Sequence, residues 1–225
     1  MDNPVSRIPF DPYDFFGYLA SGLVVIAGMD LVLGFPNILR RDFKIIDGIL
    51  LLIAVYVMGQ IVASLAKAVI EDGLVGRMLR RPGVNLFETK KPRIRGFFFP
   101  GYYKPFPEQT RQIILSKAES EGVKGADEDL FLHVRYSPVV LQDQKLMDKL
   151  NSFINKYGFN RNLGFAAFIV GIALLIKAKF FASSDPEQLK YGITALVVSI
   201  FLLYRYLKFF RQYSYEMFNA YGRAK

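Results

Sequence analysis

Four long apolar segments dominate the pattern of hydrophobic and polar positions along the chain. A transmembrane helix needs about 20 consecutive, mostly apolar residues to cross the hydrocarbon core of a bilayer, and each segment supplies roughly that number. A chain of 225 residues is too short to cover four such helices inside a soluble core. The pattern therefore predicts four membrane-spanning helices, at Phe15–Phe35, Ile45–Ile70, Leu163–Phe181 and Tyr191–Phe210.

Turn-forming residues divide these segments into two helical hairpins. Gly34, Pro36 and Asn37 interrupt the first pair, and Ser183–Pro186 interrupts the second. Pro186 also suits the first helical position of the fourth segment. The sequence thus predicts an N-terminal segment with the first hairpin, an inserted cytoplasmic domain, a second hairpin and a basic cytoplasmic tail, over residues 1–70, 71–162, 163–210 and 211–225.

The distribution of basic residues favours one orientation across the membrane. Sixteen Lys and Arg lie between residues 70 and 162, and five more lie between residues 205 and 225. The positive-inside rule therefore places the central domain and both termini in the cytoplasm, with the protein in an inner or plasma membrane. Arg40 and Arg41, in the first hairpin, count against this orientation.

The inserted domain combines helix and strand patterns. Apolar positions at helical spacing from Leu146 predict an amphipathic helix that Gly158 interrupts. Pro107 and Gly122 bracket a second predicted helix at Glu108–Glu121. The stretches RIRGFFF and DLFLHVRYSPVVL predict two strands. The expected fold class is therefore a mainly α membrane protein with a small α+β domain between its second and third transmembrane helices.

The stretch Lys90–Phe106, KKPRIRGFFFPGYYKPF, mixes five basic with six aromatic residues. A nucleic-acid groove uses such a mixture, and so does a segment at the headgroup layer of an anionic membrane. The stretch begins about twenty residues after the second apolar segment, which favours the membrane interface over direct contact with nucleic acid. The predicted interface residues are Arg77, Arg80, Arg81, Phe97, Phe98 and Phe99.

The net charge of +9 favours anionic partners, which include lipid headgroups, a small anionic ligand and an acidic protein. The chain has no cysteine and a single histidine, His133, so thiolate and multi-histidine metal sites are excluded. No phosphate-binding or metalloprotease motif is present, so we expect no cofactor, no metal and no catalytic residue. His133 is expected to be structural. The predicted contacts for a ligand or cytoplasmic partner protein are Arg93, Arg95, Lys104 and Arg135.

Asp30 and Gln60 are the predicted polar positions within the membrane. Such groups mark transport pathways by default, but a proton or ion relay needs a chain of them, and none is visible in the sequence. A hydrogen bond to another helix accounts for Gln60. Ala167 and Gly171 have the spacing that lets helices approach closely, either within one chain or in a homo-oligomer.

These features predict a non-enzymatic membrane sensor or effector. Its basic cytoplasmic domain would bind an anionic ligand or partner and couple it to an oligomeric transmembrane bundle. Small bacterial proteins of this architecture often serve in stress or phage-defence modules, which is an analogy of architecture alone. The first alternative is a membrane anchor that recruits a cytoplasmic or nucleic-acid-bound partner, and the second is a small channel or transporter lined by Asp30 and Gln60.

Overall fold

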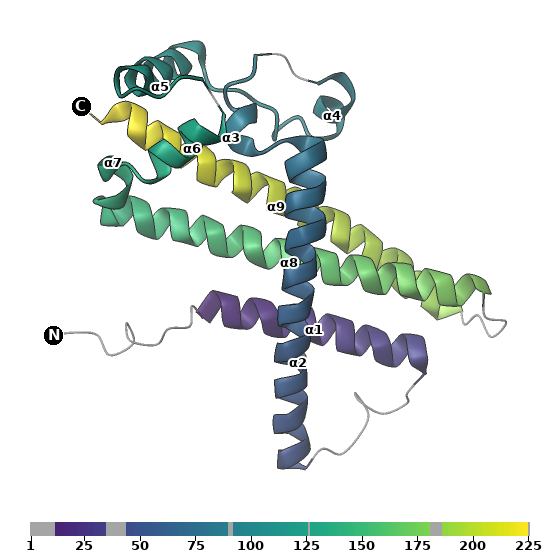
Figure 1. Cartoon of the computed structure of the whole chain (residues 1–225). Helices are drawn as coiled ribbons and strands as arrows, with labels where there is room; N and C mark the ends of the chain where they lie inside the picture. The colour runs from purple at the N-terminus through teal and green to yellow at the C-terminus, as the bar shows by residue number, and fades with distance from the viewer. Residues whose placement is uncertain (1–11, 35–43, 90–91, 126, 181–185, 225) are drawn as a thin grey trace. The chain divides into compact units, whose positions relative to one another are not determined.

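Helices and turns account for the regular structure of the computed structural model, which describes residues 12–34, 44–89, 92–125, 127–180 and 186–224 (Figure 1). Some predicted features fall on other residues. These are the turn chemistry of Pro36, Asn37 and Ser183–Asp185, and the basic pair of Arg40 and Arg41, all of which lie outside the described residues.

The longest helices carry the apolar segments. They are α1 (Pro12–Leu33), α2 (Ile45–Ala66), α8 (Gln144–Phe180) and α9 (Pro186–Arg223), and the π-helix η2 (Lys67–Leu79) follows α2 directly in the chain. The helices that hold the predicted spans are long and apolar enough to cross a membrane, which confirms a multi-pass architecture at this level. The fourth of them begins at Pro186, as the sequence indicated.

Short helices connect η2 to α8. They are α3 (Pro82–Asn85), α4 (Arg93–Phe98), α5 (Glu108–Ser120), α6 (Glu128–Arg135) and α7 (Pro138–Leu141). The helix predicted at Glu108–Glu121 is confirmed as α5. The predicted α+β domain is wrong, because the described part of this region contains helices and no strand.

The strand predicted in DLFLHVRYSPVVL is the helix α6 instead. The side chain of Asp127 accepts a hydrogen bond from the backbone N–H of Asp129 at 3.2 Å and caps the start of this helix. Leu130 and Val134, four residues apart, are both completely buried. These two residues fit the alternation of a strand, but their spacing also places them on one face of a helix. Burial of that face favours the helix over the strand.

The strand predicted in RIRGFFF is also a helix, α4, and none of its residues is buried. A strand needs a neighbouring strand to accept its backbone hydrogen bonds, and the described chain offers none. The backbone N–H of Gly96 instead donates to the carbonyl of Pro92 at 2.7 Å, and that of Phe99 donates to Arg95 at 2.9 Å. These local bonds satisfy the chain where no sheet is available.

The helix predicted before Gly158 does not stop there but continues as α8 to Phe180. A Cβ added at Gly158 would meet no atom within 4 Å, so packing does not require glycine at this position. A glycine inside a helix costs about 1 kcal/mol relative to alanine, which the long helix tolerates. The basic tail likewise continues the fourth apolar segment as the last part of α9.

Contacts within the chain divide it into two compact units. The first comprises Met1–Glu71 and Gly158–Leu203, and the second comprises Asp72–Tyr157 and Tyr204–Lys225. The 29 basic and 20 acidic residues of the chain divide as 9 and 9 in the first unit and 20 and 11 in the second. The second unit therefore carries the whole net charge of +9.

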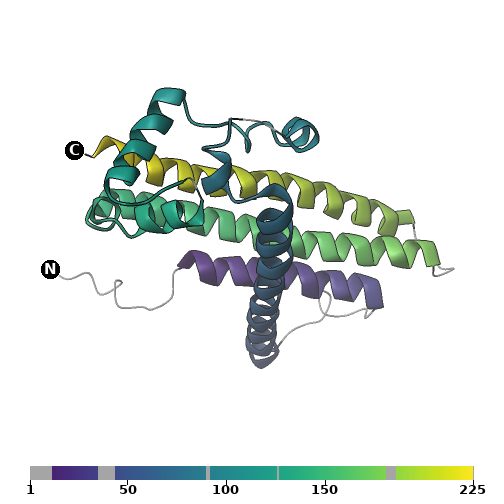
Figure 2. The same ribbon diagram turned by 45° about the horizontal axis from the view of Figure 1, so that its top comes forward.

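Glycines allow the closest helix contact in the first unit, where α1 crosses α2 (Figure 2). A Cβ added at Gly22 would lie 1.8 Å from the carbonyl oxygen of Val55. A Cβ added at Gly59 would lie 1.9 Å from the carbonyl oxygen of Tyr18. Both distances are far below van der Waals contact, so any larger residue at either position would push the two helices apart.

The predicted small-residue pair Ala167 and Gly171 also packs within the chain. Ala167 is buried, and a Cβ added at Gly171 would lie 2.9 Å from the Leu196 side chain of α9. Gly171 therefore allows the close approach of α8 and α9 within one chain, and the buried Ala167 packs inside the same chain.

The core of the second unit is built around the last part of α9. Tyr213, Met217 and Tyr221 recur at four-residue steps along this helix and are all buried. The aromatic ring of Phe106 stacks on that of Tyr215 with 4.8 Å between their centroids. The remaining buried members of this core come from α9 itself, from the short helices and the segments beside them, and from the start of α8, and they are Phe218, Leu86, Phe87, Ile114, Ala118, Leu130, Val134, Val140, Leu146 and Leu150.

Candidate functional site

The candidate site lies at the end of η2. The last carbonyl groups of a helix have no partner within it, so they need hydrogen-bond donors from other residues. The Tyr103 hydroxyl donates to the Leu79 carbonyl at 2.9 Å, and the Tyr102 hydroxyl donates to the Arg80 carbonyl at 2.7 Å. The Asn85 amide donates to both of these carbonyls at 3.2 Å. Side chains from the segment after η2 thus cap the end of this helix. The sequence contains no familiar capping pattern that would have predicted these contacts.

Arg80 itself has a φ of 62°, the left-handed conformation in which glycine usually ends a helix. Burial raises the pKa of both Tyr102 and Tyr103, so both hydroxyl groups remain protonated donors at neutral pH. Two buried tyrosine hydroxyls therefore hold the turn that follows η2 in place.

Further contacts attach α4 at both of its ends. The Arg95 guanidinium donates to the Met78 carbonyl at the end of η2. At the other end, the Tyr204 hydroxyl of α9 donates to the Phe98 carbonyl at 2.8 Å, and the ring of Phe99 packs on that of Tyr204 with 5.1 Å between centroids. α4 is therefore fixed to two helices while its remaining side chains project outward.

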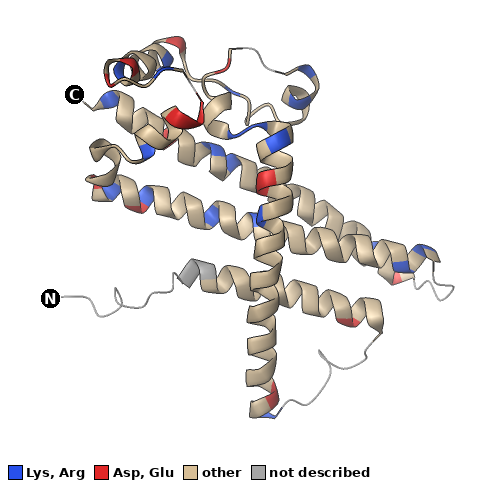
Figure 3. Cartoon of the chain, viewed as in Figure 1, with Lys and Arg blue, Asp and Glu red and all other residues tan. Residues whose placement is uncertain are grey.

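The outward side of α4 is both apolar and basic. Ile94, Phe97 and Phe98 are 76%, 79% and 57% exposed. Arg93, Arg95 and Lys104 are exposed as well, and Figure 3 shows Lys and Arg side by side on α4 and at the end of η2. We call these six residues the basic–aromatic surface. Large apolar side chains exposed beside cations indicate a binding surface rather than ordinary solvated helix.

The other predicted interface residues divide between free and paired side chains. Arg77 is exposed. Arg80 forms an ion pair with Glu88, and Arg81 forms one with Glu128. Exposed pairs of this kind contribute little to stability, but they neutralise the two arginines. The third predicted phenylalanine, Phe99, is only half-buried but packs on Tyr204, so it is not part of the basic–aromatic surface.

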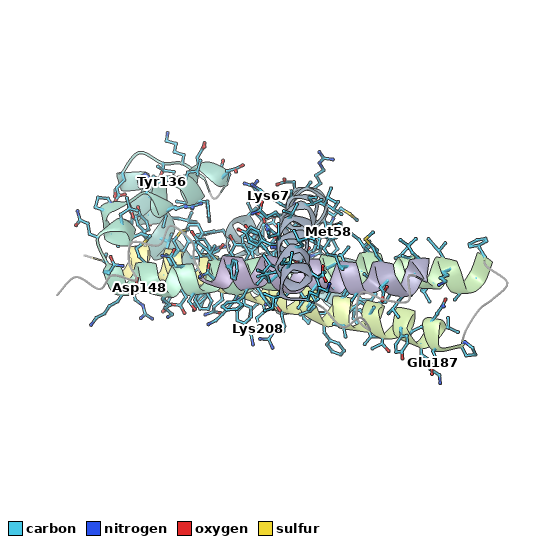
Figure 4. The ribbon with its side chains drawn as sticks, turned by 90° about the horizontal axis from the view of Figure 1, so that it is seen from below. Met58, Lys67, Tyr136, Asp148, Glu187 and Lys208 are labelled. Carbon is cyan, nitrogen blue, oxygen red and sulfur yellow. The ribbon has the colours of Figure 1, made fainter. Side chains whose placement is uncertain are left out.

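Arg135 does not join the other predicted ligand contacts. It lies on α6, which Figure 1 shows apart from α4, and its guanidinium lies over the Tyr136 ring at 5.8 Å. Tyr136, labelled in Figure 4, is 63% exposed. Arg93 and Arg95 therefore lie on α4 with exposed Lys104 six residues after its end, and Arg135 lies outside the basic–aromatic surface.

The predicted intramembrane residues are separate as well. Gln60 is exposed and lies next to the α1–α2 crossing at Gly59. Asp30 is half-buried and lies eight residues along α1 from Gly22, or roughly 12 Å at the helical rise. Lys177 donates to the carbonyl of Leu31 at 2.9 Å. No hydrogen bond from another described helix reaches the Gln60 side chain, so the interhelical partner expected from the sequence is not within the described protomer.

A charged cluster in the second unit was missed by sequence reasoning. The ring of His133 lies 2.6 Å from the Glu121 carboxylate, and the Tyr221 hydroxyl donates to the same carboxylate at 2.8 Å. Hydrogen bonds from His133 and Tyr221 lower the pKa of Glu121. This arrangement joins α5, α6 and α9, which agrees with a structural role for His133. The described residues contain no group of acidic or histidine side chains that could hold a metal ion.

A second missed contact lies in the first unit. Arg161 forms an ion pair with Glu71, and the two side chains are 13% and 24% exposed. Arg161 also donates to the Asn162 side chain at 3.1 Å. Glu71 directly follows the second apolar segment and Arg161 lies two residues before the third, so the opposite charges at these two segment ends were a signal available in the sequence.

Comparison of the chain with protein-family models, curated proteins and solved structures found no match.

Proposed function

We propose that this chain is a non-enzymatic multi-pass membrane protein that senses the anionic headgroups of its own leaflet through the basic–aromatic surface. The observation that carries the proposal is the combination of three strongly exposed apolar side chains with exposed Arg93 and Arg95 on α4, and with exposed Lys104 in the segment that follows it. A lipid interface satisfies both kinds of side chain at once, since the cations contact phosphates and the aromatic rings enter the headgroup layer.

Energetic considerations support this partner. Each basic residue near an anionic leaflet contributes about 1 kcal/mol. Full burial of one large apolar side chain contributes about 1.5–3 kcal/mol, so partial burial of Phe97 and Phe98 adds a term of similar size. The net charge of +9 in the second unit acts in the same direction over longer range.

The attachment of α4 suggests how docking is transmitted. Arg95, Tyr102 and Tyr103 hold the carbonyls that end η2, and η2 follows the second apolar helix directly in the chain. Docking of α4 on headgroups therefore acts on the end of η2. With the positive-inside orientation, the second unit and both termini lie in the cytoplasm.

The fluorescence of a single tryptophan tests the proposal, because the chain contains no tryptophan of its own. Full-length Phe97→Trp protein is reconstituted in vesicles of neutral lipid and in vesicles with added anionic lipid. We expect a blue shift of the emission only with anionic lipid. The matched control is Tyr136→Trp, at another exposed aromatic residue of the second unit, which should not shift. An unshifted Phe97→Trp emission in anionic vesicles would refute the proposal.

An acidic partner protein is the alternative occupant of the same surface, as the anchor hypothesis requires. In that case the Phe97→Trp emission stays unshifted in every vesicle and responds to a cytoplasmic extract. A channel lined by Asp30 and Gln60 gains no support, because the two residues belong to different parts of the first unit.

A further inference from the structure

One face of α2 carries an exposed heptad pattern. Residues at alternating steps of four and three along this helix recur on a single stripe, as in a coiled-coil seam. The four apolar members near its start are 70%, 61%, 54% and 50% exposed, and the last two, both polar, are exposed too. We call this stripe the α2 seam, and its residues are Ile46, Leu50, Ile53, Val57, Gln60 and Ser64.

The opposite face of α2 is already used within the protomer. Val55, Gly59, Val62 and Ala66 are buried, again at steps of four and three. At 100° per residue this buried stripe and the α2 seam point in nearly opposite directions, so α1 cannot cover the seam. Figure 4 looks along α2, on which Met58 is labelled.

Gln60 distinguishes a protein partner from lipid at this seam. Its carboxamide lies inside the most apolar of the predicted spans, is exposed, and has no partner among the described residues. Lipid tails offer no hydrogen bond, so a polar side chain left facing them costs free energy. Ser64 does not share this problem, because its hydroxyl donates to the Gln60 backbone carbonyl at 3.0 Å.

A carboxamide is complementary to itself, since it carries two N–H donors and one carbonyl acceptor. All copies of the chain insert into the membrane in the same direction, so a two-fold axis along the membrane normal brings each seam residue against the same residue of a second copy. We propose that α2 is the homo-oligomer interface, where the α2 seam packs on that of a second copy with Gln60 bonded to Gln60 at its polar centre.

This interface specifies the homo-oligomer that the sequence predicts, and it rests on the proposed function only where docking of α4 is said to act on η2. Docking of α4 acts on the end of η2, and η2 follows the helix that carries the α2 seam. Lipid docking and self-association are nevertheless measured separately, by the Phe97→Trp emission and by cross-linking. Failure of one measurement leaves the other unaffected.

Disulfide cross-linking tests the interface on a clean background, because the chain contains no cysteine. Ile53→Cys and Ser64→Cys place a thiol in the seam, whereas Leu52→Cys and Leu65→Cys place one at the adjacent residue, about 100° around the helix. Leu52, Ile53 and Leu65 are 51%, 54% and 48% exposed, and Ser64 is exposed as well, so all four thiols are accessible. Each variant of the full-length chain is oxidised in its native membrane with a membrane-permeant catalyst.

We expect dimer yields several-fold higher for the two seam variants than for their neighbours. Equal yields within each pair would overturn the proposal: equally low yields would assign this face to lipid, and equally high yields would show association with no preference for the α2 seam. Gln60→Leu in the Ser64→Cys background should weaken association about tenfold, measured as the protein-to-lipid ratio needed for half-maximal cross-linking, whereas Gln60→Asn should retain most of it. Unchanged association of Gln60→Leu would remove Gln60 from the interface and contradict the proposal.

Discussion

Neutralising two exposed cations should release α4 from an anionic membrane and leave its fold intact. Arg93 and Lys104 are the residues to change, because both side chains are exposed. Arg95 is unsuitable, since its guanidinium also donates to the carbonyl of Met78 and helps to cap η2. Arg93→Gln with Lys104→Gln therefore tests the charge of the surface without disturbing its attachment.

The expected magnitude follows from the number of charges removed. Each basic residue at an anionic leaflet contributes about 1 kcal/mol, so the double variant loses about 2 kcal/mol of docking free energy. Since 1.4 kcal/mol corresponds to about a tenfold change in an equilibrium, the ratio of docked to free α4 should fall about 30-fold. Salt reduces the effect, because exposed charges are screened beyond about 8 Å at physiological ionic strength.

The Phe97→Trp emission supplies the assay. Vesicles with increasing fractions of anionic lipid give the fraction at which half of the blue shift is reached, and this fraction should rise strongly in the double variant. The matched control is Lys124→Gln with Lys145→Gln, which removes the same net charge from exposed positions of the second unit outside the basic–aromatic surface. An equal displacement in the control, or none in the double variant, would refute local recognition by α4.

Three further predictions concern the fold that holds the site. Gly59→Leu should disrupt the α1–α2 crossing and cause aggregation in fluorescence-detected size-exclusion chromatography, whereas Gly48→Leu, where a Cβ meets no atom within 4 Å, should not. Tyr103→Phe should lose about 1 kcal/mol of local stability and speed amide hydrogen exchange in residues 92–104, whereas Tyr136→Phe should not change it. The pKa of Glu121 is lowered in the folded protein, so its contribution to stability is present above the ordinary value of 4.5 and is lost as pH falls through the folded value. Glu121→Gln should therefore flatten the acid limb of a thermal-denaturation pH profile, and a profile like that of the unmodified protein would contradict the cluster.

The sequence predicted the long helices well because membrane spans depend on composition over about 20 residues. The length and apolar character of these segments predict helix whatever the local capping and turn residues are. The start of α9 at Pro186 was also predicted. The continuation of α8 through Gly158 was missed, because a single glycine costs only about 1 kcal/mol and the residues on both sides favour helix.

The short elements were harder to predict because tertiary contacts decide them. The spacing of Leu130 and Val134 is compatible with one face of a strand and with one face of a helix. The helix is favoured because it buries both residues in the core that contains the last part of α9. α4 buries none of its residues, so its sequence has no apolar periodicity from which a helix could be predicted. Its position depends on bonds to Met78 and from Tyr204, the second of which lies more than a hundred positions away in the sequence.

The candidate site was predicted in part. The composition of residues 90–106 indicated a basic–aromatic interface; Phe97, Phe98, Arg93, Arg95 and Lys104 are exposed, and their role at an interface stays a prediction. Composition could not separate these residues from Arg80 and Arg81, which pair with acidic residues. Nor could it show that Gln60 faces away from its own protomer, because that depends on which face of α2 the glycine crossing uses.

The most direct test of lipid sensing is quenching of the Phe97→Trp indole by lipids brominated on their acyl chains. Full-length protein is reconstituted in anionic bilayers that contain such lipids, and acrylamide in the aqueous phase serves as the opposing quencher. Contact between α4 and the membrane predicts strong quenching by bromine and weak quenching by acrylamide, with the reverse for Tyr136→Trp. Strong acrylamide quenching of Phe97→Trp together with no bromine quenching would show that α4 stays in water, and would contradict the proposed function.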